Sequence, residues 1–418
     1  MLNEINEEKI KLIYENPFIN LEEEEEKAKQ KLKDIFFTIK DIFQYYCDLN
    51  EEYYTIIPLW VIGTYFHKNF PSYPYLFLNA TKGSGKSRTV NLIVTLSKEG
   101  IMLNSLTEAV LFRTNGTLGI DEFESVERKG KEGLRELLNS AYKQGTLVKR
   151  MKKVKTLKGE DQVVETFEVY RPIVMANIWG MEDVLGDRCI TLILEKSNKP
   201  DIVNLIEIFR DDSTVKKVIE DLKEISEGSL CRFFRLCRKE NIYNIYKEWN
   251  NFIKENVTNV TNITNTTNVT NSTRYIKEPD TLFKVIKEMK VMGRDLELCF
   301  PLLLIANEIS EDLLEETANI LSDIILKKRE EEFIENKDIN LIDFVSQKEE
   351  SESFVSIKTL TYEFKNWLSS EEEWINEKWM GRALKRLNLI KYKRKIGNRG
   401  REVILDVKKA KEKIKMFK

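Results

Sequence analysis

The sequence has almost no histidine and no paired cysteines. His67 is the single histidine, and the five cysteines form no Cys-x-x-Cys pair. Structural zinc sites are built from closely spaced ligands of these two types. The sequence therefore predicts a protein that holds no zinc.

Long apolar runs are missing as well. The stretch from Leu298 to Ala306 is far shorter than the roughly 20 residues that a membrane helix needs, and the first residues lack the apolar core of a signal peptide. We therefore expect a cytoplasmic protein with no membrane partner. A formal net charge of -2 also excludes a general attraction to nucleic acid, so any such attraction must come from a local patch.

The composition is that of a soluble globular chain with several domains. Of its 418 residues, 42% are hydrophobic and 33% are charged. This length exceeds the size at which one hydrophobic core stops growing, so two or three domains are expected. The chain is long enough for an enzyme.

Hydrophobic patterning changes along the chain and predicts four regions. Residues 1–70 read as helices, and residues 71–200 as short apolar strands alternating with helices, which is typical of a parallel sheet covered on both faces. Residues 201–345 return to helices. Within them, 256–273 repeat Asn-x-Thr or Asn-x-Ser and are interpreted as a flexible low-complexity insertion. Residues 354–418 show two amphipathic helices and a basic turn between strands, which suggests a winged helix.

One segment of the α/β region predicts a phosphate-binding loop. An apolar strand enters a glycine-containing loop, and a helix leaves it, as a P-loop requires. Ala80 departs from the usual first glycine, but alanine can occupy that turn if its φ is negative. The expected nucleotide-binding residues are Ala80, Thr81, Lys82, Gly83, Ser84, Gly85, Lys86 and Ser87.

The residue types in this loop fit ATP and Mg²⁺. Gly83 and Gly85 permit backbone conformations that point successive N–H groups at phosphate oxygens, and the helix N-terminus adds its positive end. Lys86 would neutralise the β and γ phosphates, and the Ser87 hydroxyl would ligate Mg²⁺. The competing interpretation is a fortuitous glycine-rich turn.

Two acids follow an apolar strand about 35 residues further on. We expect Asp121 to hold Mg²⁺ through water and Glu122 to polarise the attacking water, which is the division of labour that phosphoryl transfer needs. The alternative is an acidic turn after a strand.

Two further strands carry polar residues at their ends. Asn177 follows one strand and can orient the lytic water or touch the γ-phosphate, although it could also be a simple cap. Arg188 precedes the next strand, and its rigid fork suits the charge of a phosphoryl transition state. A surface Asp-Arg pair is the alternative for this position.

Taken in this order, these motifs resemble an AAA+ ATPase core. More narrowly, the segment from Leu106 to Leu194 is similar to an ATPase domain of primase-helicase-like replication proteins of plasmids and phages. The resemblance implies a homo-oligomeric ring in which Arg188 projects into a neighbour's site. The sequence from Gly293 to Leu296 resembles that domain's helical lid, which implies that Arg294 is a sensor arginine reporting the γ-phosphate.

The C-terminal segment supplies the local basic patch that DNA binding requires. Between Asn376 and Lys418 there are sixteen basic and four acidic residues, a net charge of about +12. The second predicted helix carries Arg382, Lys385 and Arg386, and residues 392–401 would form a basic wing. A solvated charge run is the alternative.

These features together predict an ATP-dependent AAA+ ATPase that acts on DNA, such as a helicase or replication motor of a mobile element. A second basic stretch, 149–158, would form a hairpin pointing into a ring pore. The alternative function is an ATP-regulated DNA-binding switch that does not translocate.

Overall fold

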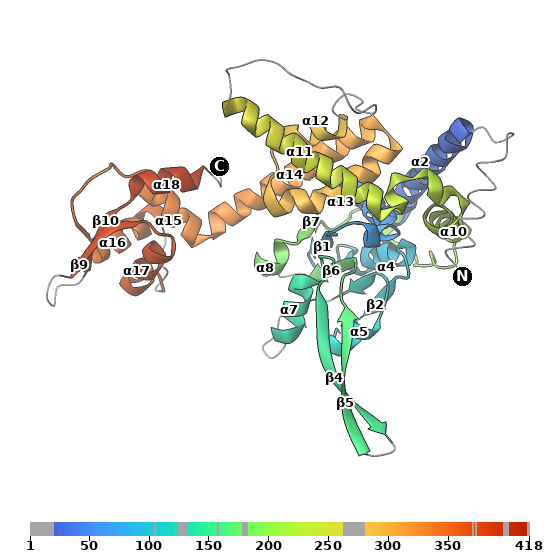
Figure 1. The fold of residues 1–418 in the computed structure, drawn as a ribbon, viewed down its shortest axis with the longest axis horizontal. Coiled ribbons are helices and arrows are strands. Elements are labelled where there is room, and N and C mark those ends of the chain that lie inside the picture. The colour runs from blue at the N-terminus through green and yellow to red at the C-terminus, as the bar shows by residue number, and fades with distance from the viewer. Residues whose placement is uncertain are drawn as a thin grey trace, which may run out of the picture. The chain divides into compact units, whose positions relative to one another are not determined.

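The apolar segments predicted as strands form one parallel sheet. Its strands are β1 (Tyr75–Ala80), β2 (Ile101–Leu103), β3 (Leu118–Ile120), β6 (Ile173–Asn177) and β7 (Cys189–Leu194), in the spatial order β2-β3-β6-β1-β7 (Figure 1). Every neighbouring pair is parallel. Burial on both faces explains why most of these strands are nearly continuous apolar runs. The α/β class predicted from the sequence is confirmed.

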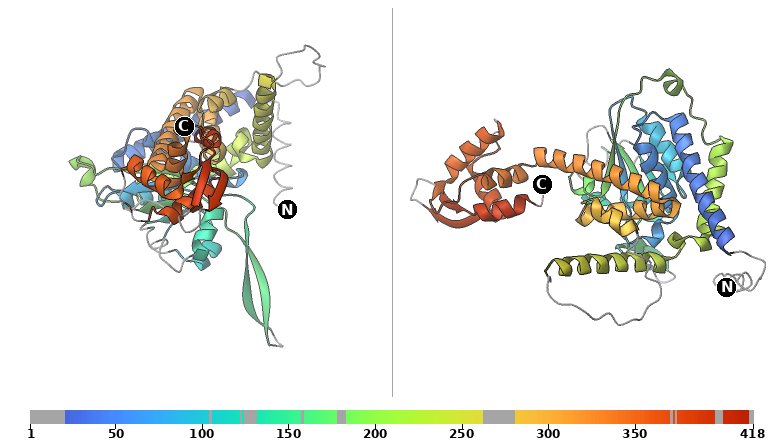
Figure 2. Two further views of the ribbon diagram at one scale, coloured as in Figure 1. Left: turned by 90° about the vertical axis from the view of Figure 1, so that its left-hand side faces the viewer. Right: turned by 90° about the horizontal axis from the view of Figure 1, so that it is seen from above.

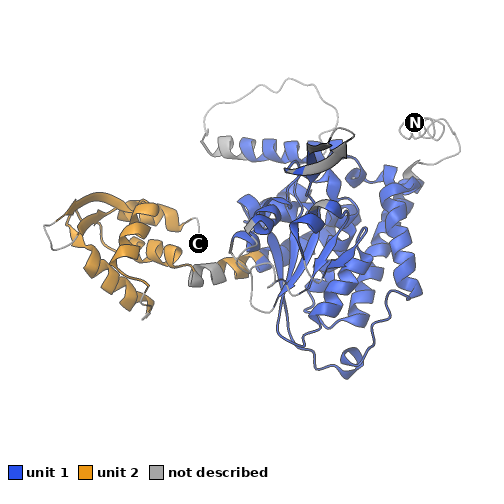
Figure 3. Cartoon of the chain, turned by 90° about the horizontal axis from the view of Figure 1, so that it is seen from below, with its two compact units in different colours: residues 1–324 blue, residues 325–418 orange. Residues whose placement is uncertain are grey.

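The computed structural model describes most of the chain. The described residues are 21–103, 106–121, 123, 132–156, 159–177, 183–261, 281–369, 372, 374–395 and 401–415. The chain divides into two compact units, residues 1–324 and residues 325–418 (Figure 3). The sheet belongs to the first unit. None of the helices within these described ranges is long and apolar enough to span a membrane.

Helices cover both faces of the sheet. Helix α4 (Lys86–Leu96) packs across β1, β6, β3 and β2. It approaches so closely that a β-carbon at Gly119 would lie 2.3 Å from Cγ2 of Val94, which explains the glycine in β3. On the opposite face, α5 (Glu108–Arg113) and α7 (Glu132–Ser140) share an apolar cluster with β1, β3 and β6.

A long hairpin separates β3 from β6. Its strands, β4 (Leu147–Thr156) and β5 (Gly159–Glu168), pair antiparallel along their whole length and project from the sheet in Figure 1. The hairpin predicted for the basic stretch 149–158 is therefore present in the backbone. Its placement in a ring pore stays a prediction.

The N-terminal helices are part of the first unit's core. Helix α3 (Tyr53–Thr64) is buried at every residue and packs on α2 (Leu21–Tyr46), α4 and α13 (Gly293–Ile309). Helix α2, blue in Figure 2, runs beside α10 (Ser213–Glu227). The described residues of the region predicted as 1–70, from residue 21 onward, therefore belong to the first unit and form no separate domain.

The remaining elements of the first unit are mainly helical, as predicted for residues 201–345. The α-helices are α8 (Asp183–Gly186), α9 (Pro200–Val203), α11 (Lys239–Thr261), α12 (Thr281–Glu288) and α14 (Glu311–Glu335), the last of which contains the division between the units. The 3₁₀ helices are η1 (His67–Asn69), η2 (Ser229–Phe233) and η3 (Arg235–Cys237). The predicted flexible insertion 256–273 is wrong in its first residues, because 256–261 are the helical end of α11; from position 262 onward it lies outside the described residues.

The second unit is a small α/β unit with its own core. In chain order it contains α15 (Lys337–Ser346), β8 (Val355–Ser356), α16 (Ile357–Leu368), α17 (Glu377–Arg386), β9 (Ile390–Lys395), β10 (Arg401–Leu405) and α18 (Val407–Ile414). The three strands form an antiparallel sheet in the order β8-β10-β9.

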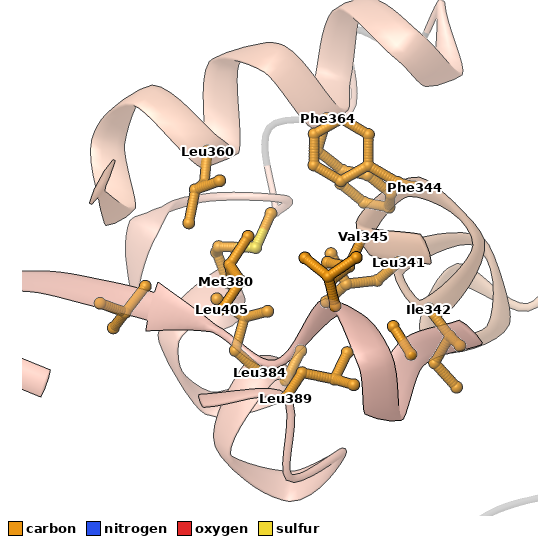
Figure 4. Close-up of a cluster of buried hydrophobic side chains, with 14 of the residues drawn as sticks. Leu341, Ile342, Phe344, Val345, Leu360, Phe364, Met380, Leu384, Leu389 and Leu405 are labelled. Carbon is orange, nitrogen blue, oxygen red and sulfur yellow. The ribbon is translucent and has the colours of Figure 1, made fainter. Parts of the chain in front are cut away.

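The second unit begins before the boundary predicted at residue 354. Side chains of α15, among them Leu341, Phe344 and Val345, pack against α16, α17 and β10 in one apolar cluster (Figure 4). A division at residue 354 would separate these side chains from their partners. The pattern of α15 resembled that of the preceding helices, and only the tertiary packing distinguishes it.

The single histidine gives the first unit a pH-dependent stability. His67 is buried, its Nδ1 lies 2.7 Å from the carbonyl oxygen of Thr64, and burial lowers its pKa to about 4. The unfolded chain protonates His67 near pH 6.5, before the folded chain does. The contribution of neutral His67 to the free energy of unfolding is therefore fully present above pH 6.5, and it is lost as the pH falls from about 6.5 to about 4.

We expect His67→Gln to remove this contribution. Relative to the variant, the wild type should lose about 3 kcal/mol of unfolding free energy between pH 6.5 and pH 4, because a shift of one pKa unit corresponds to about 1.4 kcal/mol. Denaturant unfolding of both proteins across this pH range measures the difference. The carboxylates titrate equally in the two proteins, so their effect on stability cancels in the comparison. Parallel stability curves would contradict the assignment.

Candidate functional site

The predicted phosphate loop has the backbone that its glycines allow. It connects β1 to α4, with φ of +82° at Gly83 and +79° at Gly85, which caps the helix. An added β-carbon would meet no atom within 4 Å at Gly85, so glycine is required by the dihedral and not by crowding. Ala80 is not among the residues with positive φ, as its place in the turn requires.

The lysine of the loop contacts the acid at the end of β3. Lys86 Nζ lies 2.9 Å from Asp121 Oδ1, and both side chains are less than a fifth exposed. Strand β6 lies between β1 and β3, so this contact crosses the carboxyl end of the intervening strand. Phosphate loop and acid, 35 positions apart in sequence, therefore form one site.

Asn177 completes this edge of the sheet. It is fully buried, ends β6, and stands opposite Asn79 of β1 in the register of the strands. Lys86, Asp121 and Asn177 consequently lie at the carboxyl ends of three adjacent parallel strands, where open α/β sheets bind their ligands. Glu122, the predicted polariser of water, lies outside the described residues, and its role stays a prediction.

The residues present fit a magnesium nucleotide. Within the described ranges there is no cluster of three or more His, Cys, Asp or Glu side chains that could hold a metal alone. Mg²⁺ usually takes one or two protein ligands and completes its shell with phosphate and water. Asp121 and the exposed hydroxyl of Ser87, which follows Lys86, supply this minimal set.

The phosphate loop opens into a pocket of about 720 Å³. Its floor is formed by residues 81–89. One wall is the end of α2 with the residues after it, Tyr46, Cys47 and Asp48, and the other comes from the segment after β7, including Ile202 and Val203. The volume is within the range of small-molecule sites.

Arg88 joins the two walls of this pocket. Its guanidinium donates to the carbonyl oxygens of Ile202 at 2.8 Å and Leu205 at 2.6 Å, and to that of Tyr46 at 3.4 Å. Asp48 accepts from Lys199 Nζ at 2.8 Å and from the Ser197 hydroxyl. The ion pair with Lys199 lowers the pKa of Asp48, so this carboxylate is charged at neutral pH.

The pocket walls contain residues that sequence reasoning missed. Nothing distinguishes Arg88 from other helix arginines in the sequence, and Asp48 lies about 30 positions before the loop. Asp48 is brought to the pocket by packing between distant segments, and only that packing gives Arg88 its carbonyl partners in the two walls. Ser84, which was predicted, has a buried hydroxyl without a partner among the described residues, and a phosphate oxygen would satisfy it.

Arg188 lies at the opposite end of the sheet from the phosphate loop. It precedes β7, whose first residue Cys189 pairs with Tyr75 and whose last residue Leu194 pairs with Ala80. Five residues of strand separate the two ends by ~17 Å. Arg188 Nε donates to the carbonyl oxygen of Asn139 at 2.7 Å, and its guanidinium lies 5.3 Å from the centre of the Tyr142 ring.

Arg294 does not occupy the position that the resemblance implied. A sensor arginine of a lid would lie over the γ-phosphate beside the loop. Arg294, at the start of α13, instead forms an ion pair with Asp187, which immediately precedes Arg188. Arg188 and Arg294 therefore both lie at the amino edge of the sheet, whereas Lys86, Asp121 and Asn177 lie at the carboxyl ends of its strands.

The second unit contains a basic cleft. A pocket of about 610 Å³ lies between α17 and the strands β9 and β10. Its basic lining residues are Lys385, Lys391, Lys393, Arg394, Lys395 and Arg401.

Two arginines of this predicted basic region have carboxylate partners. Arg386 donates to both carboxylate oxygens of Asp338, at 2.7 Å each from Nη2, and Arg394 pairs with Glu402 at 2.7 Å. Within the described part of the unit, Lys385, Lys391 and Lys393 have no such partner. These three lysines of the cleft are therefore available to a polyanion.

No known family model matches the sequence. No curated protein is significantly similar to it.

Proposed function

We propose that this chain binds ATP with Mg²⁺ at the phosphate loop and hydrolyses it as an AAA+-type motor that acts on DNA. The observation that carries the proposal is the 2.9 Å contact between Lys86 of the loop and Asp121 at the end of β3. A fortuitous glycine turn has no reason to meet a second, separate acidic strand end. The pair is what a site for phosphates and a divalent cation needs.

Each polar residue has a task in this proposal. Lys86 leaves Asp121 for the β and γ phosphates, and the backbone N–H groups of the loop and the start of α4 hold their oxygens. Asp121 and Ser87 hold Mg²⁺, which supplies charge compensation on the phosphates. Asn177 orients the attacking water, and Glu122, by the sequence prediction, removes its proton.

The arrangement of strands supports the AAA+ type within this proposal. Strand β6, which carries Asn177, lies between the loop strand β1 and the acid strand β3. Arg188, at the far edge, is too distant to reach its own phosphate loop, and a ring would bring it to a neighbour's loop. A homo-oligomer is therefore part of the proposal.

The second unit supports DNA as the partner. Its order of helix, strand, two helices and a two-stranded hairpin is the order of a winged helix, with α17 as the second of the two adjacent helices and β9–β10 as the wing. The lysines of the basic cleft lie on these elements. A cluster of unpaired cations on one face is the electrostatic footprint of a nucleic-acid-binding protein.

The experiment that tests the function is ATP hydrolysis with and without single-stranded and double-stranded DNA. Turnover that requires Mg²⁺ and rises with DNA is expected for a motor. ATP binding and DNA binding without stimulated turnover would favour the ATP-regulated switch. Absence of ATP binding would refute both.

For the basic cleft, we expect the triple variant Lys385→Ala, Lys391→Ala and Lys393→Ala to lose most DNA affinity. The plot of log affinity against log salt should become less steep by about 0.9 for each phosphate contact that is lost. The matched control removes two lysines of α18, Lys408 and Lys411, and its C-cap Lys415, none of which lines the cleft. Equal losses in both triples would show that net charge, and not the cleft, binds DNA.

A further inference from the structure

The amino end of the sheet carries two arginines on one surface. Arg188 and Asp187 precede β7, and Asp187 holds Arg294 of α13 in an ion pair in which neither side chain is more than half exposed. A guanidinium is always charged and presents a planar fork that matches phosphate oxygens. Arg294 pairs with the residue that immediately precedes Arg188, so both guanidinium groups belong to the amino edge of the sheet, where they could act on one anion of more than one charge.

The position of Arg294 is fixed by the packing of its helix. Leu298, one turn further along α13, lies in the apolar cluster that includes Tyr75, Leu185 and Cys189. The Glu297 carboxylate forms an ion pair with Lys143 at 2.8 Å, and the Glu297 carbonyl oxygen accepts a hydrogen bond from the Ser72 hydroxyl at 3.4 Å. These partners lie at or shortly before the start of β1, at or shortly before the start of β7, or after α7, so α13 begins at the amino edge of the sheet.

The nucleotide pocket of the same chain is not within reach of this helix. The residues that line it come from the end of α2, the phosphate loop, α4 and the segment after β7, and none belongs to α12 or α13. The strand length that separates Arg188 from the loop, ~17 Å, separates Arg294 from it as well. Arg294 therefore has no path to its own γ-phosphate while α13 keeps these contacts.

We propose that Arg294 acts with Arg188 on the nucleotide bound by a second copy of this chain. This inference rests on the proposed ATPase function and on its ring. When the neighbour's triphosphate meets the amino edge, Arg294 exchanges Asp187 for phosphate oxygen, and the two arginines share the charge of the transferring phosphoryl group. The resemblance implied a sensor acting within its own chain, whereas the geometry assigns Arg294 to the face that acts on the neighbour.

Mixing variants distinguishes the two assignments. Lys86→Ala damages the loop side of a subunit, and Arg188→Ala damages the amino edge. If Arg294 also acts on the neighbour, mixing Arg294→Ala with Lys86→Ala restores sites in which every residue is intact. Mixing Arg294→Ala with Arg188→Ala restores none, because both lesions lie on the same edge.

An arginine acting within its own chain gives the reverse pattern. Arg294→Ala would then fail to recover with Lys86→Ala, since both lesions would lie on the loop side, and would recover with Arg188→Ala. This outcome overturns the inference but leaves the proposed function in place. Failure of the pair Lys86→Ala with Arg188→Ala, in co-assembled rings, removes the trans-acting edge and the inference with it.

A matched control separates catalysis from the anchoring of α13. Arg235→Ala breaks the ion pair with Glu308, 2.6 Å long, at the other end of the same helix. We expect Arg294→Ala to bind ATP as the wild type does and to hydrolyse it on the order of 100-fold more slowly, as for loss of one transition-state donor. Arg235→Ala should keep its turnover. An equal loss in both variants, at equal thermal stability, would assign the effect of Arg294 to packing and overturn the proposal.

Discussion

We expect Lys86→Ala to abolish the ATP binding that we propose for this loop, as measured by calorimetry. Lys86 is the loop side chain that we expect to neutralise the β and γ phosphates; it lines the pocket, and its ammonium lies 2.9 Å from Asp121. Loss of one hydrogen bond between charged groups costs about 2–3 kcal/mol, which corresponds to a fall in affinity on the order of 100-fold. The remaining phosphate charge adds to this loss.

The control for this variant is a lysine at the other end of the same helix. Lys98 follows α4 and pairs with Glu227, far from the phosphate loop. Lys98→Ala should bind ATP with the affinity of the wild type. Thermal unfolding of both variants shows whether Lys86→Ala is folded. ATP affinity equal to that of the wild type in a folded Lys86→Ala would remove this pocket from consideration as the nucleotide site.

The parts of the site that are local in sequence could be predicted from it. The strand, the glycine loop and the helix of residues 75–96 follow from apolar patterning and from the φ that glycine permits, and the structure has them at the expected positions. The meeting of Asp121 with Lys86 also follows, because parallel strands present their carboxyl ends at one edge. Rules that act over a few residues determine these features.

The parts that depend on packing between distant segments could not be predicted. The pocket wall formed by Tyr46 and Asp48 requires α2 to lie beside α4, and the ion pair of Arg294 requires α13 to begin at the amino edge. Amphipathic spacing predicts that a helix buries one face, but not what covers that face. For this reason the N-terminal region had no expected role, and Arg294 was expected at the other end of the sheet.

The second large effect is expected for Arg188→Ala, which should lower the rate of ATP hydrolysis without changing the affinity for ATP. Its guanidinium lies at the edge opposite its own loop, so in the proposed function it acts on a nucleotide held by another subunit. An arginine supplied in this way contributes on the order of 10³ to 10⁵ in rate. We expect Arg188→Ala to bind ATP normally and to lose hydrolysis. In the wild type, activity per subunit should rise with protein concentration as rings assemble.

Mixing Arg188→Ala with Lys86→Ala is the sharper measurement. The first subunit keeps an intact loop and the second keeps an intact arginine, so about a quarter of the interfaces in a randomly assembled ring combine the two. A mixture should therefore regain activity that neither variant has alone. Size-exclusion chromatography of differently tagged subunits confirms that they assemble together. An inactive mixture of co-assembled subunits, or a dilute monomer that hydrolyses ATP at the full rate, would exclude Arg188 as a residue that acts across the interface.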